Sequence, residues 1–321
     1  MDIFSDFSPT PLNWIDFCYA GETLQIGLKR DDLPCPLRGG NKFRKLRYHP
    51  LFVHPESGAE VVSVGGGYSN FVIALTLLCV DVGCKPHFIT NHRGEDSWLM
   101  QFCKEAGAAF YSTSNSRLRV WRKVGFNPGE ISEKLNDCIR IPEGGGGKWS
   151  ERGVAEMVEE IKAQVTGQSF HLLVGAGTGT TCRFILKYLP PTWKLSAYPG
   201  VRGVPFREFL EEMAKEVGRS ESFSLLNIEL DRGIGFISEE EAGLIELFYQ
   251  QTGVLLDPFY SGKALVAWVR SDDRKLPAIL IHSGGIQAWI GLAQHSRSQV
   301  VRKLGAIATD KLRKVKVDLF L

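Results

Sequence analysis

The sequence predicts an α/β protein built on parallel sheets. Short β-branched or apolar runs alternate along the chain with segments of helical periodicity, which is the pattern of strand–helix–strand units. The run at 170–174 is apolar almost throughout, as in strands that are covered on both faces. Glycine-rich segments at 65–70, 175–181 and 282–285 each follow such a run. Because ligands of parallel sheets collect at the carboxyl ends of the strands, we expect a site at these segments.

Composition and charge narrow the class of protein. Hydrophobic residues make up 44% of the 321 residues, which is typical of a globular chain with a sizeable core. The formal net charge is only +2, so we expect neither a nucleic-acid nor a membrane partner. No apolar run approaches the roughly 18 residues of a membrane-spanning helix, and residues 1–11 lack the apolar centre of a signal peptide. We therefore predict a cytoplasmic protein.

Cysteine and histidine usage argues against a metal site. The seven cysteines are scattered, their number is odd and no CxxC pair occurs. This pattern favours free thiols over a disulfide scaffold or a structural zinc. His49 and His54 each precede a proline, and neither has a third ligand at a suitable spacing. We therefore predict no bound metal.

The strands are predicted from their β-branched and apolar content and from the turns that bound them. The segment at 23–29 alternates, whereas 60–64 is rich in valine. Apart from 23–29, residues 1–40 are expected to be irregular. In chain order, the predicted strands are 23–29, 60–64, 86–90, 108–111, 138–142, 170–174, 194–198 and 278–281.

The helices are predicted from their periodicity and their ends. Apolar residues within 149–165 recur on one helical face. Ser238 and Glu241 have the spacing of a capping box, and Gly107 follows a helix as a terminator. In chain order, the predicted helices are 42–52, 71–80, 97–106, 149–165, 182–188, 205–217, 238–252 and a last one that ends at Arg270.

The segment Gly175–Thr181 combines glycines, hydroxyls and the start of a helix. Backbone N–H groups and the helix dipole at such a position favour an anion such as phosphate. It is not a Walker loop, because no Gly-Lys-Ser/Thr follows. It also lacks the full G-x-G-x-x-G spacing and the later acidic residue of an NAD site. A tight turn without a ligand is the alternative interpretation.

A second segment, residues 38–46 (RGGNKFRKL), places two glycines among four cations. Such a run is usually a solvated surface. A lysine combined with a phosphate site, however, suggests an aldehyde cofactor held as a Schiff base. His282 beside Ser283 suggests a hydrolase pair instead, although the G-x-S-x-G elbow is missing.

Seven motif blocks occur in order along nearly the whole chain. They are 28–33, 39–46, 65–70, 141–145, 175–180, 256–263 and 282–285. In these blocks the chain resembles the 1-aminocyclopropane-1-carboxylate deaminase / D-cysteine desulfhydrase family, which consists of pyridoxal-phosphate enzymes. The resemblance implies the tryptophan synthase β-like fold (fold type II), with two three-layer α/β domains and mostly parallel sheets. It also implies a pyridoxal 5′-phosphate (PLP) cofactor.

The resemblance implies catalytic roles for Lys42, Ser69 and Tyr260. Lys42 is expected to be the Schiff-base lysine, and Lys45 is expected to reach the cofactor phosphate. Ser69 and Asn70 are expected to bind the substrate carboxylate and the ring hydroxyl.

The remaining roles fall in the second half of the chain. Tyr260 is expected to lie against the cofactor ring, touch the substrate and act as a second acid/base group. Ser283 is expected to meet the pyridine nitrogen. The expected phosphate cradle is Ala176, Gly177, Thr178, Gly179 and Thr180.

Two positions depart from the family pattern. Ser261 follows Tyr260, where the ring-opening deaminases carry glutamate and the desulfhydrases carry threonine. Ile234 stands where the family has a second active-site tyrosine. Ser261 favours D-cysteine desulfhydrase over 1-aminocyclopropane-1-carboxylate deaminase. Ile234 raises the alternative of a cofactor-binding family member with little catalysis.

We therefore predict a PLP-dependent deaminase or lyase that converts a small amino acid, with D-cysteine going to pyruvate, sulfide and ammonia as the leading case. Residues 1–47 plus 156–321 are expected to form a large PLP-binding domain, and residues 48–155 a small domain. A homodimer is expected because the family usually forms one.

Overall fold

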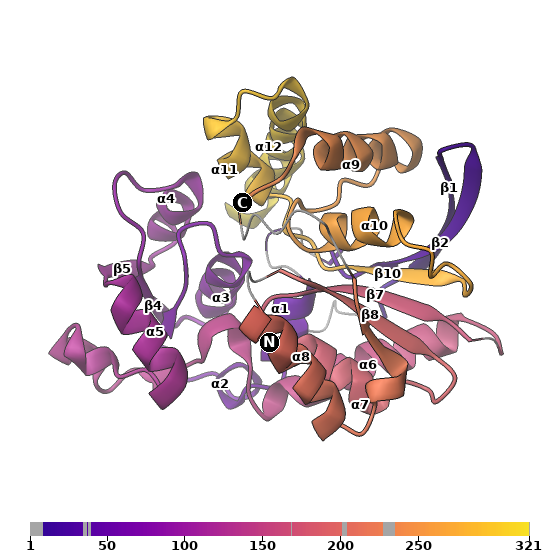
Figure 1. Cartoon of the computed structure of the whole chain (residues 1–321). Coiled ribbons are helices and arrows are strands. Elements are labelled where there is room, and N and C mark those ends of the chain that lie inside the picture. The colour runs from indigo at the N-terminus through magenta and orange to yellow at the C-terminus, as the bar shows by residue number, and fades with distance from the viewer. Residues whose placement is uncertain are drawn as a thin grey trace. The chain divides into compact units, whose positions relative to one another are not determined.

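The computed structural model describes residues 9–34, 37, 40–167, 169–200, 204–226 and 235–320, with side chains up to residue 314 (Figure 1). These residues divide into two compact units, one of residues 37–153 and one of residues 9–34 with 154–320. The division falls inside helix α6 (Trp149–Gln164). It groups residues 40–47 with the smaller unit, whereas the predicted domains group them with the larger one.

The smaller unit is built on four parallel strands in the order β5-β4-β3-β6. Helices α3, α4 and α5 follow β3, β4 and β5, as expected where every strand returns through a crossover. The bounds are β3 (Glu60–Val64), β4 (Lys85–Thr90), β5 (Ala109–Ser112), β6 (Ile139–Arg140), α3 (Asn70–Asp81), α4 (Trp98–Glu105) and α5 (Asn115–Val124).

A serine begins each of these three helices. The hydroxyl oxygens of Ser69, Ser97 and Ser114 accept hydrogen bonds from first-turn N–H groups at 3.1–3.2 Å. Such caps satisfy donors that have no partner within the helix. Residues 71–79 of α3 are all buried, which explains why this helix is apolar on every side.

The larger unit contains a six-stranded sheet in the order β1-β2-β10-β7-β8-β9. Only β1 and β2 pair antiparallel; the other neighbours are parallel. The bounds are β1 (Leu12–Tyr19), β2 (Glu22–Arg30), β7 (His171–Ala176), β8 (Lys194–Pro199), β9 (Phe223–Leu225) and β10 (Ala278–His282).

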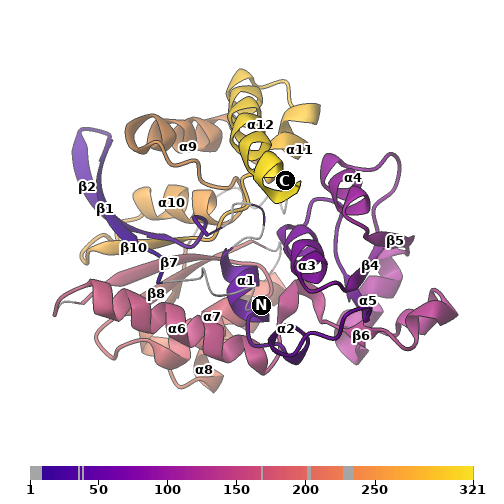
Figure 2. The same cartoon turned by 180° about the vertical axis from the view of Figure 1, so that it is seen from behind.

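Helices cover both faces of the larger sheet (Figures 1 and 2). One face carries α6, α7 (Thr180–Tyr188) and α8 (Val204–Glu216), and the other carries α9 (Glu239–Thr252) and α10 (Ser261–Val269). Helices α11 (Ala288–His295) and α12 (Gln299–Phe320) pack on each other, and α12 also packs on α9. This arrangement confirms the predicted α/β class with mostly parallel sheets.

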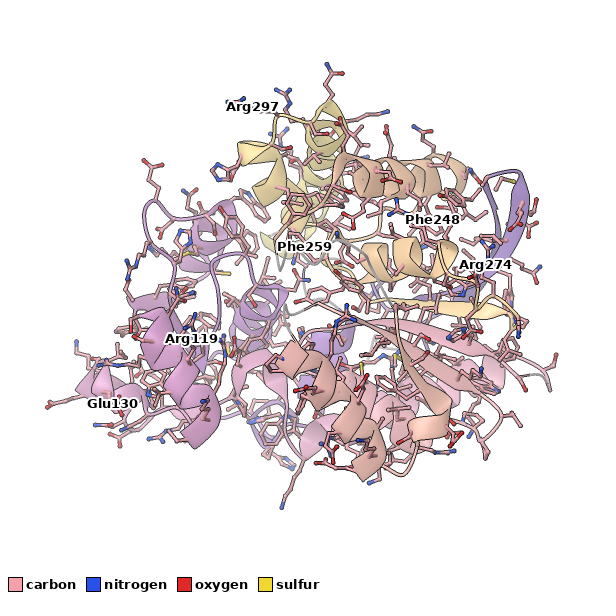
Figure 3. All side chains as sticks on the ribbon, viewed as in Figure 1. Arg119, Glu130, Phe248, Phe259, Arg274 and Arg297 are labelled. Atoms are coloured by element: carbon pink, nitrogen blue, oxygen red, sulfur yellow. The ribbon has the colours of Figure 1, made fainter. Side chains whose placement is uncertain are left out.

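The predicted apolar face of α6 is part of the core. Val154, Met157, Val158 and Ile161 are buried against β7 and β8, and Val165 packs beside them. On the opposite face, Phe248 of α9 meets Phe17 of β1 edge-on, with ring centroids 5.2 Å apart (Figure 3). Among the described residues, no helix is both long and apolar enough to cross a bilayer.

Two predictions about the N-terminal region are wrong. Residues 12–19 form β1 rather than an irregular segment. Half of its side chains are exposed at the sheet edge and only Phe17 is buried, so the strand lacks a clear apolar alternation. The predicted helix 42–52 is two helices, α1 (Gly40–Leu46) and α2 (Pro50–Val53). Pro50 lacks an N–H and holds His49 in an extended conformation, so α2 starts anew there.

Several elements lie outside the predicted set. They are β9, α5, α11, α12 and the 3₁₀ turns η1 (Pro128–Glu130), η2 (Glu133–Leu135), η3 (Glu143–Gly145) and η4 (Ser220–Ser222). Helix α5 is mostly polar, with only Leu118 and Trp121 buried, so two apolar contacts on one side hold it in place. Such a short apolar stripe gives a weak sequence signal.

Candidate active site

Lys42 lies in α1 of the smaller unit and is half-buried. Burial lowers the pKa of its amine from 10.5 to about 8, and the nearby charge of Glu143 opposes part of this shift. A lysine with such a pKa holds a substantial neutral fraction near pH 7. Only the neutral amine has the lone pair that attacks a carbonyl carbon, so Lys42 is suited to bind an aldehyde.

Lys45 lies one turn further along α1 and is fully buried. Its amine donates a hydrogen bond to the carbonyl of Gly144 at 3.2 Å. This contact ties α1 to η3, which also packs against α3. The expected contact of Lys45 with a phosphate stays a prediction.

Ser69 and Asn70 begin α3 at the end of the glycine-rich segment that follows β3. A β-carbon on Gly65 would lie 2.3 Å from Val72 Cγ2, so only glycine lets the segment turn so closely over the helix. Ser69 and Asn70 are half-buried at a helix N-terminus, a position that favours an anion, and their predicted contact with a substrate carboxylate stays a prediction. Since α1 and α3 are in contact, the helices that carry Lys42 and Ser69 lie side by side.

The segment 175–180 of the larger unit joins β7 to α7. Gly179 has φ +76° and begins the helix without a side-chain cap. The first intrahelical bond runs from Arg183 N to Gly179 O, so the preceding N–H groups of the first turn have no partner within α7. The hydroxyls of Thr178 and Thr180 lie 3.1 Å apart at this end. These donors suit the oxygens of a phosphate, which supports the predicted cradle.

Tyr260 lies along this segment. A β-carbon on Gly175 would come within 2.4 Å of Tyr260 Cβ, and one on Gly200 within 2.8 Å of its ring. A β-carbon on Gly177 would lie 3.4 Å from the phenol oxygen. The absence of side chains at these glycines therefore makes room for the Tyr260 ring beside the predicted phosphate cradle.

The turn that presents Tyr260 is built around the Asp257 carboxylate. Asp257 accepts hydrogen bonds from the N–H groups of Phe259, Tyr260 and Ser261 at 2.9, 2.6 and 2.7 Å. Figure 3 shows Phe259 in this turn, just before α10. One buried carboxylate thus fixes three successive N–H groups and with them the direction of Tyr260.

A buried polar network connects this turn to the end of β10. Ser261 Oγ donates to Asp257 Oδ2 at 2.5 Å and lies 3.1 Å from His282 Nδ1. On the other side, His282 Nε2 lies 3.6 Å from a carboxylate oxygen of Asp32. Tyr260 directly precedes Ser261, and Ser283 directly follows His282. The polar network therefore connects the backbone positions of two predicted site residues, Tyr260 and Ser283.

Asp32 is itself held by a two-point contact. Both of its oxygens accept hydrogen bonds from Arg30 at 2.8 Å. Burial alone raises the pKa of this carboxyl, but His282 and Arg30 together lower it below its usual value. The ionised Asp32 carboxylate, held by Arg30, therefore faces His282 at the carboxyl end of β10.

The sequence motifs contained these residues but not their connections. Three of the motif blocks contain the four residues of this network, which are Asp32, Asp257, Ser261 and His282. Only the fold brings these blocks together. The predicted hydrolase pair finds little support, because the hydroxyl beside His282 is that of Ser261, which is buried. Ile234 lies outside the described residues.

Fold and site together define a class. The described residues form two α/β units, one with a lysine of lowered pKa and the other with the predicted phosphate cradle, beside which a tyrosine lies. The chain matches the family described as "Pyridoxal-phosphate dependent enzyme" over residues 3–283. It belongs to that family, which confirms the predicted enzyme class and cofactor.

Individual relatives agree with this assignment. The chain is 25% identical to the D-cysteine desulfhydrase of Klebsiella pneumoniae (strain 342) over 90% of this chain and 95% of the relative. A solved structure described as an ACC deaminase homologue has a TM-score of 0.67 at 22% identity, with 87% of this chain and 90% of that chain covered. A hydrogen sulfide-producing enzyme of Fusobacterium nucleatum has a TM-score of 0.60 at 14% identity, with 86% and 94% covered. The structural likenesses confirm the predicted fold.

Proposed function

We propose that this protein is a PLP-dependent deaminase of a small amino acid and that its substrate is D-cysteine. The reaction converts D-cysteine and water to pyruvate, hydrogen sulfide and ammonia. Bound PLP supplies an electron sink for the negative charge that remains when the Cα proton leaves. Family membership supports the cofactor, and the environment of Ser261 carries the choice of substrate.

Ser261 favours the desulfhydrase because the side chain at this position lies directly against the Asp257 carboxylate. Its hydroxyl donates to Asp257 Oδ2 at 2.5 Å inside a buried turn. A glutamate at this position, as in the ring-opening deaminases, would bring a second carboxylate against Asp257, beside His282 Nδ1. A hydroxyl residue, such as this serine or the threonine of the desulfhydrases, can instead donate a hydrogen bond to that carboxylate.

The chain supplies the remaining functions through its own groups. In its neutral form, the Lys42 amine would hold the cofactor aldehyde and, when released by the substrate, would be the base for the Cα proton. Ser69 and Asn70 at the N-terminus of α3 bind the substrate carboxylate and the ring hydroxyl. The start of α7 with Thr178 and Thr180 binds the phosphate. Tyr260 donates a proton to the leaving sulfur, and Ser283 offers a neutral hydroxyl to the pyridine nitrogen.

The decisive experiment combines spectroscopy with a substrate screen. Purified protein is reduced with borohydride, the labelled peptide is mapped, and sulfide and keto acid are measured with D-cysteine, L-cysteine and 1-aminocyclopropane-1-carboxylate. We expect cofactor on Lys42 and sulfide from D-cysteine. Lys42→Ala is expected to lose the covalent cofactor and turnover, whereas the exposed control Lys104→Ala keeps both.

Other outcomes select the alternatives. Keto acid from 1-aminocyclopropane-1-carboxylate without sulfide from D-cysteine would make the chain a ring-opening deaminase, the activity named for one of its structural neighbours. Cofactor on Lys42 without keto acid from any substrate would make it a binding protein, consistent with Ile234. A protein that takes up no cofactor would refute the proposal. The cytoplasmic location and the homodimer stay predictions.

A further inference from the structure

Three potential metal ligands lie together on the smaller sheet, away from the residues discussed so far. Glu60 begins β3, His87 is the third residue of β4, and Cys138 directly precedes β6. Their carboxylate, imidazole and thiol ligand atoms all lie within 4.8 Å of one another. Three chemically different ligands from three segments therefore converge on one point.

The sheet register explains the convergence. Strand β3 lies between β4 and β6, and all three run parallel, so they start at the same edge. Val62 pairs with His87 and Val61 with Ile139. Since side chains alternate between faces, Glu60, His87 and Cys138 emerge on the same face. This edge is opposite to the one where the segment 65–70 leaves β3.

The His87 ring presents its Nε2 atom to the cluster. Its side chain is only 5% exposed, and among the described residues Nε2 has no hydrogen-bond partner. Nδ1 lies 3.4 Å from the Tyr111 hydroxyl, and in the tautomer with its proton on Nδ1 it can donate a hydrogen bond to that oxygen. In this tautomer the lone pair of Nε2 is available to a cation placed between it and the Glu60 oxygen 3.5 Å away. A ligating histidine typically donates its second N–H to such an outer partner.

Cys138 and Glu60 have complementary positions. Cys138 is buried, and burial raises the pKa of its thiol, so it stays protonated until a metal displaces the proton. Glu60 is 44% exposed and gives an ion access from solvent. Its present partner, Lys85 at 3.6 Å, is 57% exposed, and such a surface pair is weak enough to open.

Contrary to the sequence prediction of no bound metal, we propose that Glu60 Oε, His87 Nε2 and Cys138 Sγ form a zinc site, with water as the fourth ligand. Thiolate, imidazole and carboxylate together suit Zn²⁺, whereas Mg²⁺ and Ca²⁺ require oxygen ligands. Ordinary zinc bond lengths place ligand atoms about 3.5 Å apart. The separation of His87 Nε2 and Glu60 Oε1 is already 3.5 Å, and the other separations, at most 4.8 Å, need to shorten by no more than roughly 1 Å on binding. Binding releases the Cys138 proton and clamps the starts of β3, β4 and β6.

Zinc binding is tested on tag-free holoenzyme after dialysis against a chelator. Titration with ZnCl₂ is expected to give one bound ion and a raised unfolding temperature. Co²⁺ in place of zinc is expected to give a thiolate-to-cobalt absorption band. Cys138→Ser is expected to abolish the band and weaken zinc binding by more than about 100-fold, since even the loss of an outer partner costs 10- to 100-fold.

Matched variants distinguish zinc binding at the proposed site from zinc binding by other cysteine thiols. Cys84→Ser removes another buried cysteine, adjacent to β4 but outside the cluster, and is expected to leave the band and the zinc affinity unchanged. Glu60→Gln changes a half-exposed side chain, so it keeps the site testable if Cys138→Ser fails to fold. A wild-type protein that binds no zinc, or a zinc affinity that neither Cys138→Ser nor Glu60→Gln lowers, would overturn the proposal.

Discussion

At the scale of single residues, the Lys42 amine has the clearest chemical consequence. With a pKa of about 8, roughly a quarter of this amine is neutral at pH 7.5, against about one part in a thousand for an ordinary lysine. We expect competitive acetylation of cofactor-free protein, followed on the Lys42 peptide by mass spectrometry, to show a midpoint near pH 8. Because the Glu143 charge raises the Lys42 pKa, Glu143→Gln is expected to move the midpoint down. A midpoint near 10.5 in both proteins would contradict this account of the site.

Ser261 gives a second prediction at this scale. Ser261→Ala removes the hydroxyl shared by Asp257 and His282, which leaves His282 Nδ1 without this buried partner. We expect a loss of about 1–3 kcal/mol in the free energy of unfolding, measured with denaturant, and an altered cofactor absorbance spectrum. Ser271→Ala, at the other end of α10, removes one hydrogen bond to the Trp268 carbonyl and serves as control. Equal spectra in the two variants would show that Ser261 does not position the site.

At the scale of elements, a buried ion pair joins α9 to α10. Glu241 lies 2.5 Å from Lys263, and the two side chains are 2% and 5% exposed. Glu241 also completes the capping box with Ser238, as the sequence predicts. Burial raises the Glu241 pKa, but the Lys263 and Ser238 contacts outweigh it, so the net pKa is lowered and the carboxylate stays charged.

This pair gives the third prediction. Glu241→Gln keeps the cap but leaves Lys263 charged and buried, so we expect a loss of about 3–5 kcal/mol in unfolding free energy. Ser238→Ala, which removes only a cap contact, is expected to cost about 1 kcal/mol. Adding Lys263→Met to Glu241→Gln removes the stranded charge and is expected to recover most of the loss. Denaturant midpoints that rank Glu241→Gln no lower than Ser238→Ala would refute this role of the pair.

The same scale shows which parts of the fold the sequence could predict. Strand β3 is predicted with its observed bounds, because four of its five residues are buried and its valines follow directly from that burial. Strand β1 is exposed at an edge and α5 has two buried residues, so neither has a strong pattern. The glycine-rich segments and Lys42 could be located from motifs. The polar network from Asp257 through His282 to Asp32 could not be predicted from motifs, because it joins residues that lie more than 200 positions apart in the sequence.

At the scale of the whole molecule, buried histidines set how the fold responds to acid. His49 caps α2, packs edge-on against Trp149 and is 5% exposed. Burial lowers its pKa to about 4, and burial also lowers the pKa of His171. His49 is therefore neutral in the folded protein near pH 6, and His171 takes up a proton less readily in the folded protein than in the unfolded chain, where histidines protonate around pH 6.5. Protons then bind the unfolded state preferentially, so the free energy of unfolding falls as the pH falls.

This linkage gives the fourth prediction. For His49 alone, the pKa shift corresponds to a decrease of up to about 2 kcal/mol in the free energy of unfolding between pH 7.5 and 5. Solvent screening reduces this value. The measurement is denaturant unfolding at the two pH values in the Lys42→Ala background, where covalent attachment of the cofactor adds no pH dependence of its own. His49→Asn keeps a cap-forming side chain and removes the titrating ring, so it is expected to flatten the pH dependence. Asp32 and Glu241, whose pKa values are lowered in the folded protein, also stabilise the fold less as the pH falls, but only at lower pH. Their stabilisation is complete above the pKa that the carboxyl has in the unfolded chain, and it is lost as the pH falls through the pKa that it has in the folded protein. A His49→Asn protein that loses as much stability as its parent between pH 7.5 and 5 would place the acid sensitivity in other groups.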